Sequence, residues 1–306
     1  MLSMAAMKGW LMFWLGGIAV AVAERSENWE AFQAGLSDDP EPAFASKVMQ
    51  DGSVWSFMPT HQFYPPYLAD PRRPQLQYVF IFEGNPDIPK TGGRRSLDSA
   101  GIERSLIRWR KGDYAVEFVG NAGITAQFDF NHSLDGLGFD GWYGGGLYAT
   151  QGDWGSRFVF NHQSAHIADE YIQRVGRDRQ MYTREEVAWG VSWWGISCWR
   201  FFAEAGYGFT LNSELQSPWR LQWGLEYIGE PRFFWRSSAW YVAGSFRHME
   251  ERDWELASSL QTGFLFLSTG SQRIRAGIQV YDGQSNLGEF SNHDESYFAF
   301  GFWMDM

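Results

Sequence analysis

Apolar and polar side chains alternate with a period of two along most of the chain. Between Ala115 and Phe130 every even position is apolar or glycine, whereas Glu117 and Asp129 lie at odd positions. Residues 219–226 and 272–280 alternate in the same way. Since successive side chains of a strand point to opposite faces, each segment would have one apolar face and one charged face. A charged inner face rules out a sandwich core and favours a barrel with a lipid-facing exterior and a polar lumen.

The turn signals between these segments divide residues 75–306 into about twelve strands. The connections alternate in length, so that residues 167–184 form a long one and Lys111–Asp113 a short one. Outer-membrane barrels have long extracellular loops and short periplasmic turns, and bacterial single-chain barrels have an even number of strands. We therefore predict an all-β fold, namely an antiparallel transmembrane outer-membrane β-barrel of about twelve strands.

The final strand of the chain has an apolar face of its own. Phe298, Phe300 and Phe302 share this face with Met304 and Met306. The pattern resembles the C-terminal signature by which outer-membrane barrels are recognised for assembly, although it ends on Met306 instead of an aromatic residue. The resemblance implies that the barrel-assembly machinery is a partner of this chain.

The residues that precede the barrel divide into two further segments. Residues 1–23 contain Lys8, a short apolar run and the small-x-small pattern Ala21-Val22-Ala23, which predict a secretory signal peptide cleaved after Ala23. The apolar run is too short to favour a membrane anchor. Residues 24–74 begin near a helix-capping Ser26 and end in a Pro-rich stretch. They predict an extended periplasmic leader with a short helix, which docks against the barrel formed by residues 75–306.

The composition supports this fold class and excludes one kind of partner. The 17 Trp, 25 Phe, 13 Tyr and 34 Gly, with a mean hydropathy of -0.35, suit aromatic girdles and closely packed lumen walls. Without residues 1–23, the chain keeps 24 basic side chains (25 minus Lys8) against 36 acidic ones. It therefore lacks the basic footprint of a nucleic-acid-binding protein. Its single cysteine, Cys198, excludes a disulfide framework. The sequence leaves the oligomeric state open.

The predicted inward positions collect arginines and carboxylates. Arginine suits planar, multiply bonded ion pairs in a confined space. Such pairs would brace a narrow lumen filled with side chains, as expected for a barrel of about twelve strands, and they disfavour a general diffusion porin. The inward charges are Arg104, Arg108, Arg110, Arg200, Arg220, Arg273 and Arg275 with Glu117, Asp129, Glu204, Glu226 and Glu255.

One predicted strand changes the character of its lipid-facing side partway along. In FVFNHQSAHIADEY, which starts at residue 158, the even positions pass from Phe158 and Phe160 to His162, Ser164 and His166. If the leader begins in the periplasm, this strand runs outward. The three polar residues would then lie on the outer wall, near the extracellular rim.

These residue types in this spacing suit nucleophilic chemistry. Side chains at i and i+2 share a face of a strand, so His162 could activate the Ser164 hydroxyl, and a third group should orient the His162 ring. Glu185, on the lipid face of the next strand and at the same rim, is the preferred orienting acid. The alternatives for a site role are Asp169 and Glu170, in the loop above, and the neighbouring His166.

The stretch also resembles known membrane enzymes. His162-Gln163-Ser164 is similar to the His-Gln-Ser stretch of outer-membrane phospholipase A, whose pair lies on the lipid-facing wall of a barrel near the outer leaflet. Lipid A 3-O-deacylases use a similar His-x-Ser pair with a Glu partner. The resemblance implies that Ser164 is a nucleophile and His162 its general base. The phospholipase has an Asn where this chain has Gly176, so Glu185 is assigned from its face and rim alone.

A second resemblance covers more of the chain. The leader's PYLADPRRP (residues 66–74), the HQSAHIADEY stretch (residues 162–171) and the barrel pattern resemble a bacterial family designated domain of unknown function 1207. That resemblance implies a barrel and no particular activity.

Two hypotheses on function follow. The first is an outer-membrane barrel with a narrow or filled lumen and a structural, channel or surface-contact role. Polar residues near the top of an outward strand fit this interpretation, because the lipid-facing positions leave the hydrocarbon band there. The alternative is a serine acyl-ester hydrolase acting on outer-membrane lipid. No cofactor is expected in either case, although a calcium ion near Asp169 and Glu170 would resemble the phospholipase.

Overall fold

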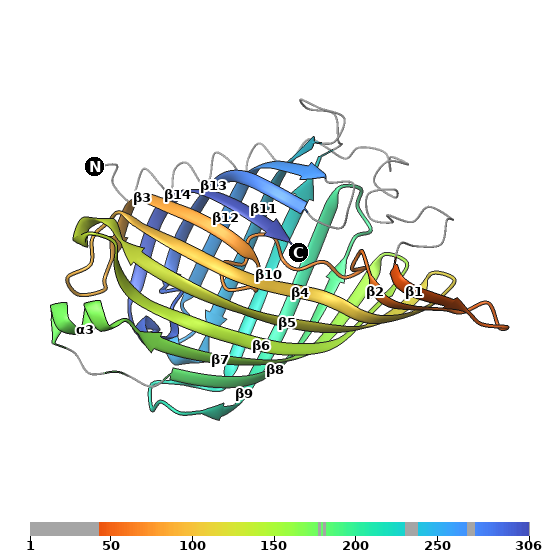
Figure 1. The fold of residues 1–306 in the computed structure, drawn as a ribbon, viewed down its shortest axis with the longest axis horizontal. Coiled ribbons are helices and arrows are strands. Elements are labelled where there is room, and N and C mark those ends of the chain that lie inside the picture. Colours follow the sequence, from red (N-terminus) through yellow and green to blue (C-terminus); the bar gives the residue numbers. More distant parts are fainter. Residues whose placement is uncertain (1–42, 177–178, 180–181, 230–237, 268–272, 306) are drawn as a thin grey trace.

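The chain forms a closed antiparallel β-barrel (Figure 1). The computed structural model describes residues 43–305 except 177–178, 180–181, 230–237 and 268–272. The predicted signal peptide and the helix after Ser26 lie outside the described residues. The barrel strands are β3 (Leu76–Pro86), β4 (Arg95–Lys111), β5 (Tyr114–Asp129), β6 (Asp135–Gln151), β7 (Trp154–Ile167), β8 (Tyr182–Trp193), β9 (Trp199–Leu211), β10 (Trp219–Ile228), β11 (Ser238–Met249), β12 (Leu256–Leu267), β13 (Arg273–Gln284) and β14 (Asp294–Asp305).

Sequential strands pair as neighbours, and β3 pairs with both β4 and β14, which closes the ring. The predicted class of fold and a strand number of about twelve are therefore confirmed. Two further strands, β1 (Ala43–Val48) and β2 (Val54–Pro59), form a hairpin that pairs with the last part of β4. No helix in the described part of the chain is both long and apolar enough to cross a membrane.

The alternation of the sequence sets which side chains point inward. In β5, Glu117 and Asp129 are buried toward the lumen, whereas Phe118 and Ile124 are exposed on the outside. Of the charges expected to point inward, Arg104 and Glu255 do not. A β-bulge between Ser105 and Ile107 shifts the alternation of β4, so Arg104 pairs with Gly120 on the outer face, whereas Arg108 pairs with the inward Glu117. The Glu255 side chain is 71% exposed. The reason is that β12 begins only at Leu256, so Glu255 belongs to the preceding loop.

Longer connections gather at one end of the barrel. They include the helix α3 (Asp169–Val175) after β7 and the 3-10 turns η2 (Phe130–His132), η3 (Glu250–Arg252) and η4 (Gly288–Phe290). Short turns such as Lys111–Asp113 lie at the other end, where the β1–β2 hairpin also lies (Figure 1). The α3 end thus has the long loops expected of the predicted extracellular end.

Residues 60–75, which join β2 to β3, run inside the barrel and are here named the plug. Tyr64, Tyr67 and Leu68 are at most 1% exposed. The Leu68 N–H donates to Glu226 Oε1 at 2.6 Å, and Arg275 Nη1 donates to the Leu68 carbonyl at 3.0 Å. Lumen side chains thus satisfy the backbone of the plug, which has no strand partner of its own.

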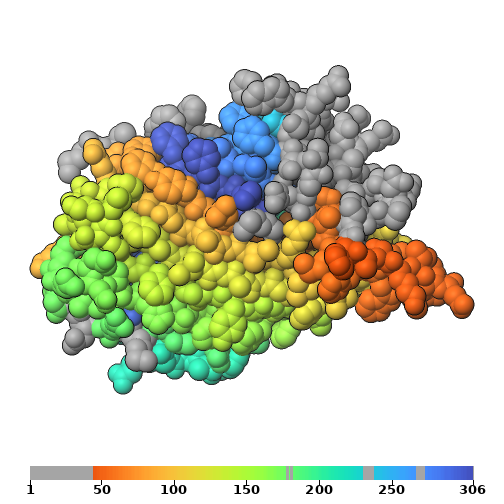
Figure 2. All heavy atoms as spheres, viewed as in Figure 1, coloured from red at the N-terminus to blue at the C-terminus, as the bar shows by residue number. Residues whose placement is uncertain are grey.

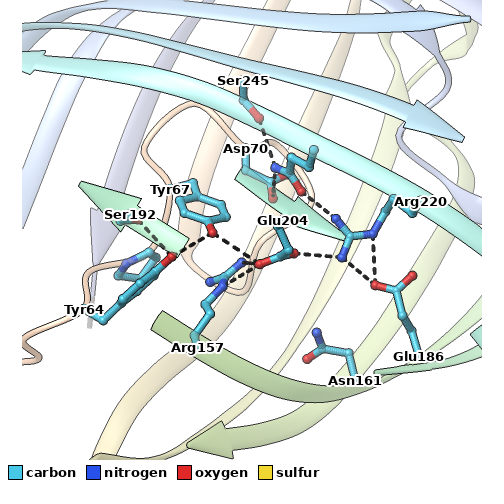
Figure 3. A network of polar contacts seen from close by, with 12 residues as sticks. Tyr64, Tyr67, Asp70, Arg157, Asn161, Glu186, Ser192, Glu204, Arg220 and Ser245 are labelled. Carbon is cyan, nitrogen blue, oxygen red and sulfur yellow. Dashed lines mark hydrogen bonds and ion pairs between the residues drawn. The ribbon is translucent and has the colours of Figure 1, made fainter. Parts of the chain in front are cut away.

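Plug side chains also join the ion pairs of the wall (Figure 3). Tyr67 stacks on Phe202 with ring centroids 3.7 Å apart, and its hydroxyl donates to Glu204 at 3.3 Å. Asp70 accepts from Arg247 at 2.9 Å. The lumen is therefore filled by a segment that its charged side chains hold in place.

Glu204 lies at the centre of this network, because two arginines from different strands converge on it. Arg157 Nε donates to one of its oxygens at 2.6 Å, and Arg220 Nη2 donates to the other at 2.8 Å. Arg220 continues to Glu186, with Nε 2.9 Å from Oε1. Arg157 and Arg220 thus each have a carboxylate partner, as the loss of hydration requires.

We predict that Glu204→Ala destabilises the barrel by about 3–5 kcal/mol, because Arg157 loses its carboxylate partner while buried and Arg220 loses one of its two. Denaturant unfolding in detergent micelles, followed by the gel-mobility shift between folded and unfolded barrel, measures the change. Glu255→Ala is the control, since its exposed pair with Arg252 is worth about 0–1 kcal/mol. Equal stability of the two variants would contradict a stabilising role for the network.

Candidate functional site

The residues His162, Ser164 and His166 lie on the outer wall of the barrel. On β7 they continue the face of Phe158, which is 54% exposed, while the intervening Gln163 is only 5% exposed and points inward. All three are near the end of β7 that leads into α3. The strand therefore presents its polar segment outside the lumen, close to the extracellular rim.

The His162 side chain has a carboxylate and an aromatic ring as neighbours. β7 and β8 pair so that Glu185 is directly opposite His162, and Nδ1 lies 3.4 Å from Glu185 Oε1. On the other side, the Tyr143 ring from β6 stacks on the imidazole, with centroids 4.4 Å apart and planes at 20°. Within the described residues no hydrogen bond reaches Nδ1. The pair is therefore at ion-pair distance without hydrogen-bond geometry.

Ser164 lies between two small neighbours on the adjacent strands. It faces Gly141 on β6 and Thr183 on β8. A Cβ atom at Gly141 would lie 3.4 Å from Ser164 Oγ, so the glycine leaves the hydroxyl uncovered on that side. No hydrogen bond joins Ser164 to His162 in the part of the chain that the structure describes. A catalytic hydrogen bond is often long in a free enzyme and tightens only around the substrate.

The alternative site residues are engaged elsewhere. Asp169, with a side chain 76% exposed, pairs with Arg179 at 2.9 Å, and Glu170 is exposed on the same helix. His166 packs against Phe139, with ring centroids 5.0 Å apart. Among the three candidate acids, contact with His162 is therefore recorded for Glu185.

The described residues contain no group of three or more His, Cys, Asp or Glu side chains that could hold a metal ion. Asp169 and Glu170 are adjacent in the first turn of α3 and have no third acidic partner of this kind. Helix α3 ends at Gly176, which adopts the left-handed conformation (φ 67°) that favours glycine.

Three neighbours of the site were not among the predicted residues. Tyr143, Gly141 and Thr183 become neighbours of the His-x-Ser pair only through the register of β6 and β8. Tyr143 lies at an outward position of its strand, and its side chain is 53% exposed. This outward position is the one signal that the sequence offers. Which residues lie opposite each other on neighbouring strands depends on how the strands pair, and the pattern of one strand alone does not show it.

The barrel also encloses a small internal cavity, of about 90 Å³. Asp70, Arg72 and Trp142 line it, together with Glu186 and Arg247. The lining is charged and the space is far smaller than an ordinary ligand pocket of about 300–1,000 Å³. This cavity is therefore a gap between the plug and the wall.

These features define an outer-membrane-type β-barrel with a filled lumen. The chain belongs to the family described as protein of unknown function (DUF1207), whose model matches residues 17–305. The predicted resemblance to this family is thereby confirmed. A comparison with curated protein sequences finds no match.

Several solved barrels are similar in fold. The active-site mutant of outer membrane phospholipase A from Escherichia coli is 10% identical over 80% of this chain and 94% of its own, with a TM-score of 0.50. Another structure of that phospholipase is 12% identical over 76% of this chain and 93% of its own, with a TM-score of 0.49. The CymD monoaromatic hydrocarbon channel is 8% identical over 76% of this chain and 87% of its own, with a TM-score of 0.39. At 8–12% identity, the likeness concerns the fold alone.

We predict that a cysteine at position 164 is accessible from the membrane and one at position 163 is not. Ser164→Cys and Gln163→Cys, each in a Cys198→Ser background, are treated with a lipid-soluble maleimide in vesicles. Labelling of the first variant alone is expected, because Gln163 is buried in the lumen. Preferential labelling at position 163 would overturn the outward placement of the site.

Proposed function

We propose that this protein is a plugged outer-membrane barrel that acts at its outer wall and extracellular rim, and not by diffusion of solutes through its lumen. The observation that carries this proposal is the plug. Its backbone and side chains are bonded to inward residues of strands on several sides of the barrel. Opening a wide pore would require the loss of these contacts together.

The proposal extends to maturation and partners. The chain would be exported with cleavage after Ala23 and inserted by the barrel-assembly machinery through its C-terminal strand. In β14, Phe300 and Phe302 are 55% and 61% exposed on the outside, which suits a strand that the machinery and the membrane both contact. Outer-membrane lipid would then surround the wall, and no nucleic acid is a partner of this acidic chain.

We predict that the purified protein in a planar lipid bilayer shows no stable, porin-sized conductance. Tyr67→Gly, which removes the ring stacked on Phe202 and the hydroxyl bonded to Glu204, is expected to increase the frequency of open events by about tenfold. Trp223→Gly, on the outer wall, is the matched control and should stay closed. Large, steady conductance of the unaltered protein would contradict the proposal.

A second candidate function is hydrolysis of an acyl ester of membrane lipid. The observation that favours it is the placement of Glu185 directly across from His162, with Ser164 on the same outer face. Strand phase alone predicts Glu185 as the orienting acid. A nucleophilic serine requires a histidine base that is held in place by such a carboxylate.

In this reaction Ser164 Oγ attacks the ester carbonyl carbon while His162 takes the hydroxyl proton. The tetrahedral intermediate collapses, and the leaving alcohol takes that proton from His162. Water then attacks the acyl-serine with His162 again as base, which releases the fatty acid and restores the serine. Glu185 would orient and stabilise the imidazolium. The steps use no cofactor, and a calcium ion beside Asp169 and Glu170 would be an addition to them.

We predict that purified protein releases fatty acid from phospholipid or lipid A in mixed micelles, and that Ser164→Ala abolishes the release. His162→Asn should reduce it by about 10²–10⁴-fold through loss of the general base. Thr183→Ala, on the same face, is the control and should retain the activity. Equal release by the unaltered protein and Ser164→Ala would exclude the hydrolase and leave the plugged barrel as the proposed function.

A further inference from the structure

The β1–β2 hairpin extends the barrel wall beyond its end. β3 pairs with β4 only as far as Ser99, whereas β2 pairs with β4 from Ile107 to Arg110. In Figure 1 the hairpin projects beyond the barrel, at the end opposite α3. An ion pair of 3.2 Å between Lys111 and Asp51 links its turn to the tip of β4.

The outer face of this extension is apolar. Trp55 is paired with Trp109 and is 47% exposed, and Phe57 is paired with Ile107 and is 48% exposed. Tyr114 packs edge-on against Trp109. Large side chains that remain so exposed on one sheet face need an apolar neighbour.

The opposite face of the hairpin carries both polar and apolar side chains. The Ser46 hydroxyl donates to that of Ser56 at 3.3 Å, and Ser56 pairs in register with Arg108, whose guanidinium binds Glu117. Val48, which is 71% exposed, and its partner Val54 share this face with Ser46 and Ser56. What distinguishes the outer face is therefore its large aromatic side chains, which continue the outer face of the barrel wall.

The apolar face runs without a break into the lipid-facing wall. Strand register joins Phe57 to Ile107, then to Phe118, and next to Leu147 and Phe158. The last three are 47%, 57% and 54% exposed on the outside of the barrel. Figure 2 shows the hairpin and the wall as one continuous surface. Lipid that covers the outer wall would therefore also contact the hairpin, because the exposed residues of this row are continuous.

We propose that the outer face of the β1–β2 hairpin and the adjoining end of β4–β5 lies in the interfacial region of the periplasmic leaflet and binds phospholipid there. Tryptophan and tyrosine concentrate where a membrane meets water, because their rings are apolar and their N–H or O–H groups remain hydrated. Lys47, paired with Trp55 on the same face, can place its ammonium group among the phosphates. The hairpin then acts as a membrane anchor that holds the entrance of the plug against the barrel.

The test uses single cysteines in a Cys198→Ser background, labelled with an environment-sensitive fluorophore. Phe57→Cys reports the apolar face, and Phe118→Cys is the reference for the lipid-facing wall. Val48→Cys is the matched control, because Val48 is 71% exposed at the hairpin tip on the same face as Ser46. The full chain is reconstituted into vesicles of phosphatidylethanolamine and phosphatidylglycerol at several protein-to-lipid ratios.

The label at position 57 should emit to the blue of that at position 48 and be quenched about twofold or more by a nitroxide lipid, as at position 118. The label at position 48 should be quenched by iodide in the water. Equal iodide quenching at positions 57 and 48 would overturn the proposal. A blue shift without nitroxide quenching would also overturn it, because residues 1–42 or another protein would then cover the face. A blue shift that grows with protein density would assign the face to a second copy.

Discussion

The structure depends on the burial of charge inside a barrel that has lipid outside it. Hydrogen bonding closes the wall, but the inward faces of β7 to β10 carry guanidinium and carboxylate groups that have lost their hydration. Such groups are tolerable only when each has a partner at close range. Glu204 and Glu186 supply this partnership for Arg157 and Arg220, and the four residues lie on four neighbouring strands, β7 to β10. Strand register and lumen electrostatics therefore constrain one another.

The plug is a consequence of the same constraint. Glu226 and Arg275 direct charge into the lumen and meet the backbone N–H and carbonyl of Leu68. A barrel without the plug would leave these groups in need of water or another partner. Because charges hold the plug through its backbone, its sequence is free to carry Tyr64 and Tyr67, which fill the remaining space with aromatic rings. With the lumen filled, the outer wall and the loops are the surfaces left for contact with other molecules.

The period of two predicted most of the barrel, because lipid outside and charge inside impose opposite chemistry on alternate residues. It placed Glu117 inside and His162 outside without knowledge of the fold. It failed at Glu255, where alternation continues past the end of a strand. It could not place residues 60–75 in the lumen, because the contacts of Leu68 come from residues more than a hundred positions away in the sequence. The partners of His162 on neighbouring strands likewise depend on register: face and rim predicted Glu185, but nothing in the pattern predicted Tyr143.

The polar segment of β7 bears on where the strand lies relative to the membrane, whether or not its residues are catalytic. A carboxylate facing the hydrocarbon of a membrane is costly unless it is paired or reaches the headgroups. Glu185 is on the outer wall with a side chain 30% exposed, and His162 beside it is 17% exposed. A pair of this kind, at the end of β7 that leads into α3, fits the predicted position near the headgroup layer. The place where β7 leaves the membrane is thus also the place where a lipid ester linkage would meet His162 and Ser164. The same location can be both the point where the strand leaves the membrane and the position of a catalytic pair. The chemistry of Ser164 decides whether the second description applies.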